Sequence, residues 1–281
     1  MKMKRIIAIN DISCLGRCSL TVILPVISSC GLECTPLPTS LLSSHTGGLP
    51  GYSFLDLSEE IPKITKQWEA LGVDAAAIYC GYLASPLQAE TVIESIRALR
   101  KEDTLVFLDP VMGDHGKLYR NITPEMVEAM EKIAAEADYL LPNLTEAHQM
   151  AHMEYRMPPY SREYLLELLG KLQKRYPKAS IILSGVEDGS QIGCAWLWEN
   201  ELQLEMHEKV SEEYHGTGDL FRSVLISAIV KGLPLKEALR TAGEFVKDCM
   251  TYTAKEQTDE RYGVLFEEYL DTLRKRMGEE R

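Results

Sequence analysis

The most informative stretch for the fold is Leu105-Val106-Phe107-Leu108-Asp109-Pro110-Val111-Met112-Gly113-Asp114, an apolar run that ends on an acidic residue and a turn. Its first four residues have no polar member, which is typical of a strand buried on both faces of a parallel sheet. Asp109 closes the run, and Asp114 follows a glycine. Ligands of open α/β sheets bind beyond the carboxyl ends of the strands. The two carboxylates are therefore candidates for a ligand site.

The same pattern recurs along the chain. Apolar runs of strand length alternate with amphipathic stretches of helix length, which is typical of proteins with a parallel α/β sheet. The predicted strands are Arg5–Asn10, Glu33–Leu37, Ala75–Tyr79, Leu105–Asp109, Tyr139–Leu141 and Ser180–Ser184. No internal repeat, low-complexity tract or long linker interrupts the alternation. We therefore predict a single α/β domain over residues 1–281, in which helices flank a central, mostly parallel, doubly wound sheet.

Local signals place the helices and one hairpin. Ser85, Thr123 and Ser161 each stand where a helix N-cap is expected, and a proline follows the first two at the first helical position. Residues 191–198 and 202–207 are predicted to form an antiparallel hairpin at an edge of the sheet. The chain beyond this hairpin is predicted to be largely helical from Asp219 onward.

The composition limits the classes of function. The 281 residues are 45% hydrophobic and carry a net charge of −12, so neither nucleic acid nor an anionic membrane surface is an expected partner. Any phosphate group must be held locally, by backbone amides, a metal or a few basic side chains. The apolar run Ile6–Asn10 is too short for a signal-peptide core, and no run approaches a membrane span. The seven cysteines lack metal-ligand spacing, so free thiols and a cytoplasmic location are expected.

The segment His215-Gly216-Thr217-Gly218-Asp219 stands before a helix-like run at residues 222–231. Two glycines before a helix let backbone N–H groups point to one place at the positive end of the helix dipole, which forms an anion-binding cradle. An aspartate there can take a proton from an attacking hydroxyl while the amides stabilise a transferring phosphoryl group. The alternative is a plain turn with Asp219 at a helix N-terminus.

Two further strand ends carry oxygen ligands. Asp109 and Asp114 lie five positions apart in a loop and could hold a hydrated Mg²⁺. Asn143 and Glu146, in Pro142-Asn143-Leu144-Thr145-Glu146, could reach the water shell of a metal or a phosphate. Alternatively, the two aspartates are ordinary strand-end and turn residues, and Asn143 or Thr145 caps a helix that has Glu146 in its first turn.

Polar segments that contain glycine occur at Asn10–Gly16 and Ser44–Gly48, and both are suited to contact a small substrate. Tyr82 could add an aromatic wall. Asp11 or Thr46, each taken alone, would more often be a cap or turn residue. Neither a Walker-type lysine loop nor a Gly-x-Gly-x-x-Gly motif after the first strand is present, which disfavours P-loop and dinucleotide-binding interpretations.

The segments at 81–83, 109–114, 142–146 and 216–219 together resemble, in order and spacing, the pyridoxal/pyridoxamine kinase family of the ribokinase superfamily. The resemblance extends over nearly the whole chain. It implies a ribokinase-like fold and transfer of the ATP γ-phosphate to the 5′-hydroxymethyl group of pyridoxal, pyridoxine or pyridoxamine. It also implies ATP and Mg²⁺ as cofactors, K⁺ as a candidate monovalent cation, and a homodimer.

The resemblance assigns roles to three groups of residues. Asp219 would be the catalytic base, with an anion hole formed by Gly216, Thr217 and Gly218. The residues implied in ATP binding are Asp109, Asp114, Asn143, Glu146, Ser184, Gly216 and Gly218, of which Asp109, Asp114 and Glu146 would organise the metal. The residues implied at the vitamer ring are Asp11, Ser13, His45, Thr46 and Tyr82.

Three positions leave alternatives open. Asp11 stands where many pyridoxal kinases have serine, and relatives that phosphorylate hydroxymethylpyrimidine tend to have aspartate there, so a hydroxymethylpyrimidine kinase of thiamine synthesis is an alternative. Arg222 stands where a small residue is usual. It could reach a phosphate, and Lys117 after Asp114 could cover the ATP phosphates if its loop closes, but we interpret both as solvated side chains. A non-catalytic sensor of B6 or ATP is an alternative of another class, and the intact Asp219 argues against it.

Overall fold

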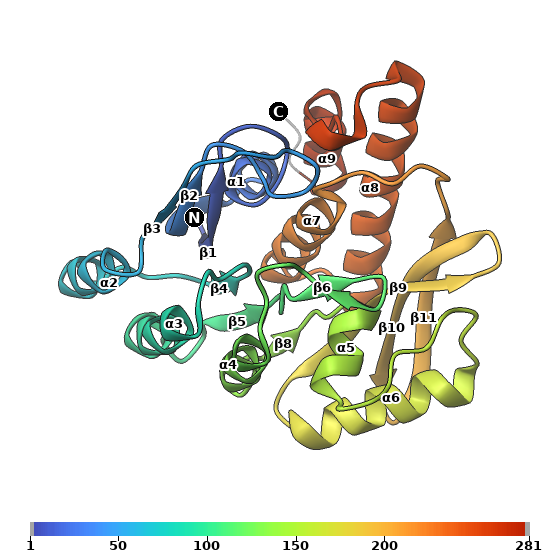
Figure 1. The fold of residues 1–281 in the computed structure, drawn as a ribbon, viewed down its shortest axis with the longest axis horizontal. Helices are drawn as coiled ribbons and strands as arrows, with labels where there is room; N and C mark the ends of the chain where they lie inside the picture. Colours follow the sequence, from blue (N-terminus) through green and yellow to red (C-terminus); the bar gives the residue numbers. More distant parts are fainter. Residues whose placement is uncertain (1–2, 279–281) are drawn as a thin grey trace.

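A nine-stranded sheet runs through the computed structural model of this chain, which describes residues 3–278 (Figure 1). Its strand order is β11-β10-β9-β8-β5-β4-β1-β2-β3. The bounds are β1 Arg5–Ser13, β2 Glu33–Leu42, β3 Phe54–Asp56, β4 Ala77–Cys80, β5 Leu105–Leu108, β8 Tyr139–Leu140, β9 Ser180–Asp188, β10 Gln191–Trp198 and β11 Glu201–Glu208. The pairs from β2 through β1, β4, β5 and β8 to β9 are parallel, while β3, β10 and β11 pair antiparallel. The predicted mostly parallel α/β sheet is therefore confirmed.

Helices cover both faces of the sheet. Their bounds are α1 Leu20–Ser29, α2 Ile61–Ala70, α3 Pro86–Leu99, α4 Pro124–Ala134, α5 Leu144–Met150, α6 Arg162–Arg175, α7 Thr217–Lys231, α8 Leu235–Glu256 and α9 Leu270–Arg276. One apolar core joins the sheet to α2 through α6, and the other joins it to α1, α7, α8 and α9. Successive residues of β1 alternate between the two cores, with Ile7 and Ile9 in the first and Ile6 and Ala8 in the second.

The predicted elements are present, with shifted ends. The edge hairpin is confirmed, because β10 pairs antiparallel with both β9 and β11. Ser85 and Ser161 cap their helices through side-chain oxygens, whereas Thr123 occupies the cap position without such a bond. The strand β1 runs three residues beyond the predicted end at Asn10, since its backbone continues to pair with β2 across a register irregularity. Three strands were missed: the edge strand β3, and β6 (Gly113–Asp114) and β7 (Lys117–Leu118), which form a small hairpin.

The topology places the carboxyl ends of β1, β4, β5 and β8 at one edge of the sheet. After β1 the chain adds β2 on one side, and it later adds β4 on the other side. The strand order therefore reverses between β1 and β4, and such a reversal leaves the crevice in which open α/β sheets bind ligands. Among residues 3–278, no helix is both long enough and apolar enough to span a membrane.

Candidate active site

Asn10 joins the ends of β1 and β4 at the point of reversal. Its side-chain Oδ1 accepts hydrogen bonds from the backbone N–H groups of Asp11 at 3.0 Å and Tyr82 at 3.1 Å. A Cβ atom on Gly81 would lie 2.3 Å from Asn10 Nδ2, so a side chain at residue 81 would push this amide out of place. The glycine therefore lets Asn10 fix how Asp11 and Tyr82 emerge from adjacent strands.

Three of the residues predicted at the substrate ring lie together beside this junction. Asp11 is 4% exposed, and its Oδ2 accepts a hydrogen bond from the buried Ser13 hydroxyl at 2.8 Å. Burial raises the pKa of Asp11, the hydroxyls of Ser19 and Ser13 oppose this, and the charge of Asp219 adds to it. Burial and the nearby charge of Asp11 raise the pKa of the half-buried Tyr82 to about 12.

The other two predicted ring residues, His45 and Thr46, differ in burial. His45 is buried, with Nε2 2.5 Å from the Arg261 carbonyl oxygen and Nδ1 3.1 Å from the Gly47 nitrogen. The Gly47 N–H donates to Nδ1, so Nε2 carries the proton that is donated to Arg261. The ring of His45 lies 4.7 Å from that of His215, which precedes Gly216. The side chain of Thr46 is exposed on the same loop, so the structure does not bring it among the buried polar groups.

The Gly-Thr-Gly-Asp segment forms the N-terminus of α7, which begins at Thr217. Gly216 has a φ of 80°, in the left-handed region that favours glycine. A Cβ atom at residue 216 would lie 2.1 Å from the carbonyl oxygen of Arg17. The first N–H groups of a helix have no partner within the helix, and they attract anions. Gly216 thus allows the loop after β1 to pack directly against this helix terminus.

Asp219 lies in the first turn of α7 and is held by the segment that precedes α1. Its Oδ2 accepts a hydrogen bond from the Ser19 backbone N–H at 2.8 Å and one from the Cys18 thiol at 3.5 Å. Ser19 has a φ of 55°, a strained backbone conformation for a residue other than glycine. Burial raises the pKa of Asp219, while the Ser19 amide, the Arg222 charge and the Cys18 thiol oppose that rise.

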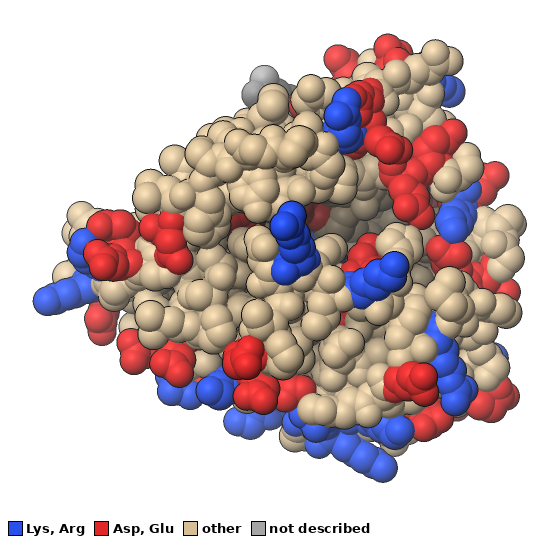
Figure 2. Space-filling model, viewed as in Figure 1, with Lys and Arg blue, Asp and Glu red and all other residues tan. Residues whose placement is uncertain are grey.

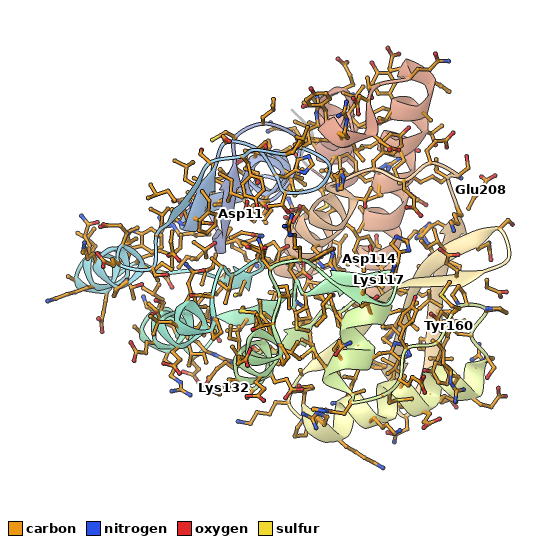
Figure 3. All side chains as sticks on the ribbon, viewed as in Figure 1. Asp11, Asp114, Lys117, Lys132, Tyr160 and Glu208 are labelled. Atoms are coloured by element: carbon orange, nitrogen blue, oxygen red, sulfur yellow. The ribbon has the colours of Figure 1, made fainter. Side chains whose placement is uncertain are left out.

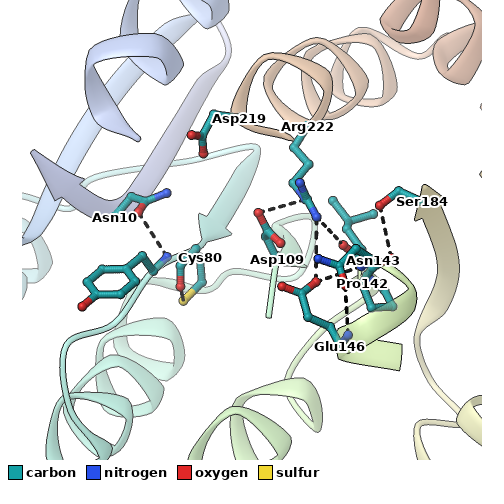
Figure 4. A network of polar contacts seen from close by, with 12 residues as sticks. Asn10, Cys80, Asp109, Pro142, Asn143, Glu146, Ser184, Asp219 and Arg222 are labelled. Atoms are coloured by element: carbon teal, nitrogen blue, oxygen red, sulfur yellow. Dashed lines mark hydrogen bonds and ion pairs between the residues drawn. The ribbon is translucent and has the colours of Figure 1, made fainter. Parts of the chain in front are cut away.

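The prediction that Arg222 is solvated is wrong. It is 8% exposed and lies with Asp109 and Glu146, each 2% exposed, in what we call the acidic cluster (Figure 4). Its Nε lies 2.9 Å from Asp109 Oδ2, and its Nη2 donates to the Leu141 carbonyl at 3.1 Å. The same Nη2 is 4.0 Å from Glu146 Oε2. The surrounding part of α7 is buried against the sheet, and this keeps the side chain from solvent.

Glu146 caps α5 and belongs to the acidic cluster at the same time. The side chain of Asn143 accepts from the Glu146 N–H at 2.9 Å, and Glu146 Oε2 accepts from the Asn143 N–H at 2.8 Å. These two bonds form a capping box. Oε1 accepts from the Met112 N–H at 3.1 Å. Burial raises the pKa of both Asp109 and Glu146, against the opposing charge of Arg222.

Asp114 and Lys117 lie on the β6–β7 hairpin, away from the buried part of the acidic cluster. Their side chains are exposed, and Asp114 accepts a hydrogen bond from the N–H of His115. The face shown in Figure 2 is hollowed near its centre, with acidic atoms visible inside the hollow. Figure 3, in the same view, shows Asp114 and Lys117 beside this hollow and Asp11 on its other side. The hairpin is held to α5 by the Gly116 N–H, which donates a hydrogen bond to Thr145 Oγ1 at 2.8 Å.

Asp109 offers the clearest fit to a metal ion. Its buried Oδ1 accepts no hydrogen bond of ordinary geometry among residues 3–278, although the Tyr79 hydroxyl, which also has no partner there, lies close enough to lower the pKa of Asp109. A buried oxygen in this state can accept a cation or a water. No group of three or more His, Cys, Asp or Glu in that range is arranged to hold a metal by itself. Mg²⁺ commonly uses one or two carboxylates and completes its shell with water and phosphate oxygens. Asp109, with Glu146 nearby, fits that arrangement.

The predicted nucleotide residue Ser184 lies at the end of the next strand. Its hydroxyl donates a hydrogen bond to the carbonyl of Pro142 at 3.3 Å.

The interpretation of the sequence missed three residues around the carboxylates. Arg222 stands three positions after Asp219, which places both on one face of a helix, and this spacing was a usable signal. No comparable signal existed for Cys18 and Ser19, because their contacts with Asp219 join segments about 200 residues apart.

Known proteins of similar sequence and structure fall into two named groups. A family model described as phosphomethylpyrimidine kinase matches residues 24–263. A structure from Bacteroides thetaiotaomicron, provisionally named a phosphomethylpyrimidine kinase, is 37% identical with a TM-score of 0.92 and covers 97% of this chain and 94% of its own. A second crystal form of a protein of that name and organism was obtained with pyridoxal and is also 37% identical, with a TM-score of 0.91 and coverage of 97% and 96%.

Two further relatives illustrate both names. The pyridoxal kinase of Lactobacillus plantarum is 30% identical with a TM-score of 0.90 and covers 97% of each chain. The hydroxymethylpyrimidine/phosphomethylpyrimidine kinase of Staphylococcus aureus strain Mu50 is 26% identical over 242 residues, which is 80% of each chain. The match to the family model spans most of the sequence. This chain therefore belongs to the phosphomethylpyrimidine kinase family of the ribokinase superfamily, whose relatives include pyridoxal kinases and hydroxymethylpyrimidine kinases.

Proposed function

We propose that this protein transfers the γ-phosphate of ATP to the 5′-hydroxymethyl group of a B6 vitamer: pyridoxal, pyridoxine or pyridoxamine. The observation that carries the choice of substrate is the Bacteroides protein crystallised with pyridoxal, which is 37% identical and aligns with 97% of this chain. The ring would lie at the junction of β1 and β4, beside Asp11, Ser13 and Tyr82. Such a ring offers polar substituents to Asp11 and an aromatic face to Tyr82.

Asp219 is the proposed catalytic base. The bonds from Ser19 and Cys18 occupy Oδ2, so Oδ1 is the oxygen that remains to accept a proton from the substrate hydroxyl. A general base must reach the proton that it abstracts within hydrogen-bond distance. The hydrogen bond from Ser19, whose backbone is strained, holds the Asp219 carboxylate from a segment outside α7. The position of the carboxylate therefore does not depend on the Asp219 rotamer alone.

The phosphate groups are the part of the substrates that α7 and the acidic cluster would bind. Phosphoryl transfer is catalysed mainly by positioning and by neutralisation of charge. The N-terminal N–H groups of α7, at Gly216 to Gly218, would face the transferring phosphoryl group. Mg²⁺, held by Asp109 and by Glu146 through water, would supply positive charge to the phosphate oxygens when it is bound. The nucleotide would be contacted from the hairpin and the neighbouring strand ends by Asp114, Asn143 and Ser184.

A hydroxymethylpyrimidine kinase is the second candidate. The family model carries that group's name, and the Staphylococcus aureus relative is a hydroxymethylpyrimidine/phosphomethylpyrimidine kinase. The two candidates share the base and the phosphate site, and they differ only in the ring that Asp11 would contact. A non-catalytic sensor would have no chemical need for the Asp219 carboxylate.

The choice of acceptor is tested by ADP release with Mg-ATP against pyridoxal, pyridoxine, pyridoxamine and hydroxymethylpyrimidine. We expect turnover on at least one B6 vitamer, and a kcat lower by about a hundredfold or more in Asp219→Asn, because a positioned base contributes about 10²–10⁴-fold. Asp248 lies on α8 and pairs with Arg276 of α9, and Asp248→Asn should retain the wild-type kcat. Turnover on the pyrimidine alone would select the second candidate, and a folded Asp219→Asn protein within about tenfold of wild type would exclude Asp219 as the base.

The pH dependence tests the environment of Asp219. The base acts only when it is deprotonated, so kcat/KM should decrease as the pH is lowered. Because burial raises the pKa of Asp219, the midpoint of this decrease should lie above the ordinary pKa range of an aspartate. Cys18→Ala removes a donor to Oδ2 that lowers this pKa, so the acid limb of the profile should move to higher pH. Cys14→Ala, an exposed thiol in the same loop, should leave the limb in place. An unchanged limb in Cys18→Ala would contradict the contact with Asp219.

The two ends of α7 provide a test of the phosphate cradle. Gly216 and Gly232 both have positive φ, at 80° and 93°, but a Cβ atom would meet another atom within 4 Å only at Gly216. We expect Gly216→Ala to lower kcat/KM by roughly a hundredfold, since small displacements of positioning groups have such effects. Gly232→Ala should lower stability by about 1 kcal/mol through backbone strain and leave kcat/KM unchanged. Equal kinetic effects of the two substitutions, measured beside thermal unfolding, would show that α7 is not positioned through Gly216.

A further inference from the structure

Arg222 is the only arginine of the described residues that is buried, at 8% exposed. The other arginines in ion pairs have side chains that are 27% to 65% exposed. A guanidinium group is removed from water at a large cost unless its environment compensates the charge. Here the compensation comes from Asp109 Oδ2 at 2.9 Å, from Glu146 Oε2 at 4.0 Å and from the Leu141 carbonyl.

The backbone of the phosphate cradle makes room for this side chain. A Cβ atom on Gly218 would lie 2.4 Å from Arg222 Nη1. Gly218 therefore leaves the space through which the Arg222 guanidinium reaches Asp109. This role is separate from the proposed contact of the Gly218 backbone with phosphate. The position of Arg222 is thus built into the same segment that presents Asp219.

More carboxyl groups than guanidinium groups lie at this place. The single guanidinium of Arg222 is close enough to Asp109, Glu146 and Asp219 for each of them to act on it electrostatically. Asp109 still has one buried oxygen, Oδ1, that accepts no hydrogen bond of ordinary geometry among residues 3–278. The cluster can accept further positive charge at that oxygen, but any cation that enters meets a positive charge already bound to the other oxygen of Asp109.

We propose that Arg222 is a built-in counter-cation of the acidic cluster, which disfavours binding of a divalent cation alone and favours its entry together with an anionic nucleotide. This inference rests on the proposed binding of Mg-ATP at this site, and it makes Arg222 a positioning residue for that complex. The guanidinium repels a free metal ion and attracts phosphate oxygens. Phosphate oxygens would in turn provide the negative charge that a metal beside Arg222 requires.

The proposal predicts effects of opposite sign when the charge is removed. In Arg222→Met, free Mn²⁺ should bind at least about tenfold more tightly, and ADP in the presence of EDTA should bind at least about tenfold more weakly. One elementary charge within a few ångströms, at an effective dielectric constant of about 20, is sufficient for changes of this size. Damage to the structure of the site would weaken both, so the opposite signs distinguish a charge effect from a folding effect.

Isothermal titration of the full-length chain with MnCl₂ alone, and separately with ADP and EDTA, measures both quantities. Arg222→Lys retains the charge and should keep the weak affinity for free Mn²⁺. Arg100→Met is the matched control, because Arg100 also pairs with a carboxylate, Asp138 at 2.7 Å, and donates to a backbone carbonyl, that of Glu136. Both affinities should remain at wild-type values in this control.

Weaker or unchanged Mn²⁺ binding in a folded Arg222→Met protein, or unchanged ADP binding, would overturn the proposal. The wild-type chain provides the test if that variant does not fold. Mn²⁺ should bind wild type at least about tenfold more weakly without ADP than with saturating ADP, and equal affinities would overturn the proposal. None of these titrations contains a phosphate acceptor, so their outcome is separate from the identity of the substrate.

Discussion

The hydrogen bond from the Ser19 backbone N–H to Asp219 Oδ2, at 2.8 Å, joins the two halves of the site. It connects the segment between β1 and α1 to the first turn of α7, which is encoded 200 residues later. The same two segments meet again where Gly216 packs on the Arg17 carbonyl. The position of Asp219 relative to Asp11, and hence of the proposed base relative to the proposed acceptor ring, depends on this packing. A strained φ at Ser19 is retained at this point, which indicates that the surrounding contacts compensate the strain.

Electrostatic coupling extends from one end of the site to the other. Burial raises the pKa of Asp11 and of Asp109, and the charge of Asp219 adds to the rise at both groups. Arg222 opposes the rise at Asp109, Glu146 and Asp219. These four neighbouring carboxyl groups would repel anionic phosphates if they stood alone. In the proposed function, positive charge for a phosphate site in this acidic chain would come from the N-terminus of α7, from Arg222 and from a divalent cation.

Much of this arrangement could be predicted from the sequence, because its signals are local. The apolar strands, the Ser85 and Ser161 caps and the edge hairpin follow from short patterns, and the structure confirms them. The structure also places Asp11, Ser13 and Tyr82 near one another, at the carboxyl ends of the adjacent strands β1 and β4. The burial of Arg222 was missed because a single charged residue in a helix is usually solvated, and its partners lie on other elements. The exposed positions of Thr46 and Asp114 depend on loop and hairpin geometry that short patterns do not specify.

In the proposed mechanism, Asp219 faces the hydroxyl group of a B6 vitamer at the junction of β1 and β4. A crystal structure of Asp219→Asn with pyridoxal and a non-hydrolysable ATP analogue tests it most directly. We expect the 5′-hydroxymethyl oxygen within hydrogen-bond distance of the side chain at residue 219, with the pyridine ring beside Asp11 and Tyr82. A ring bound elsewhere, or a hydroxymethyl group directed away from residue 219, would contradict it.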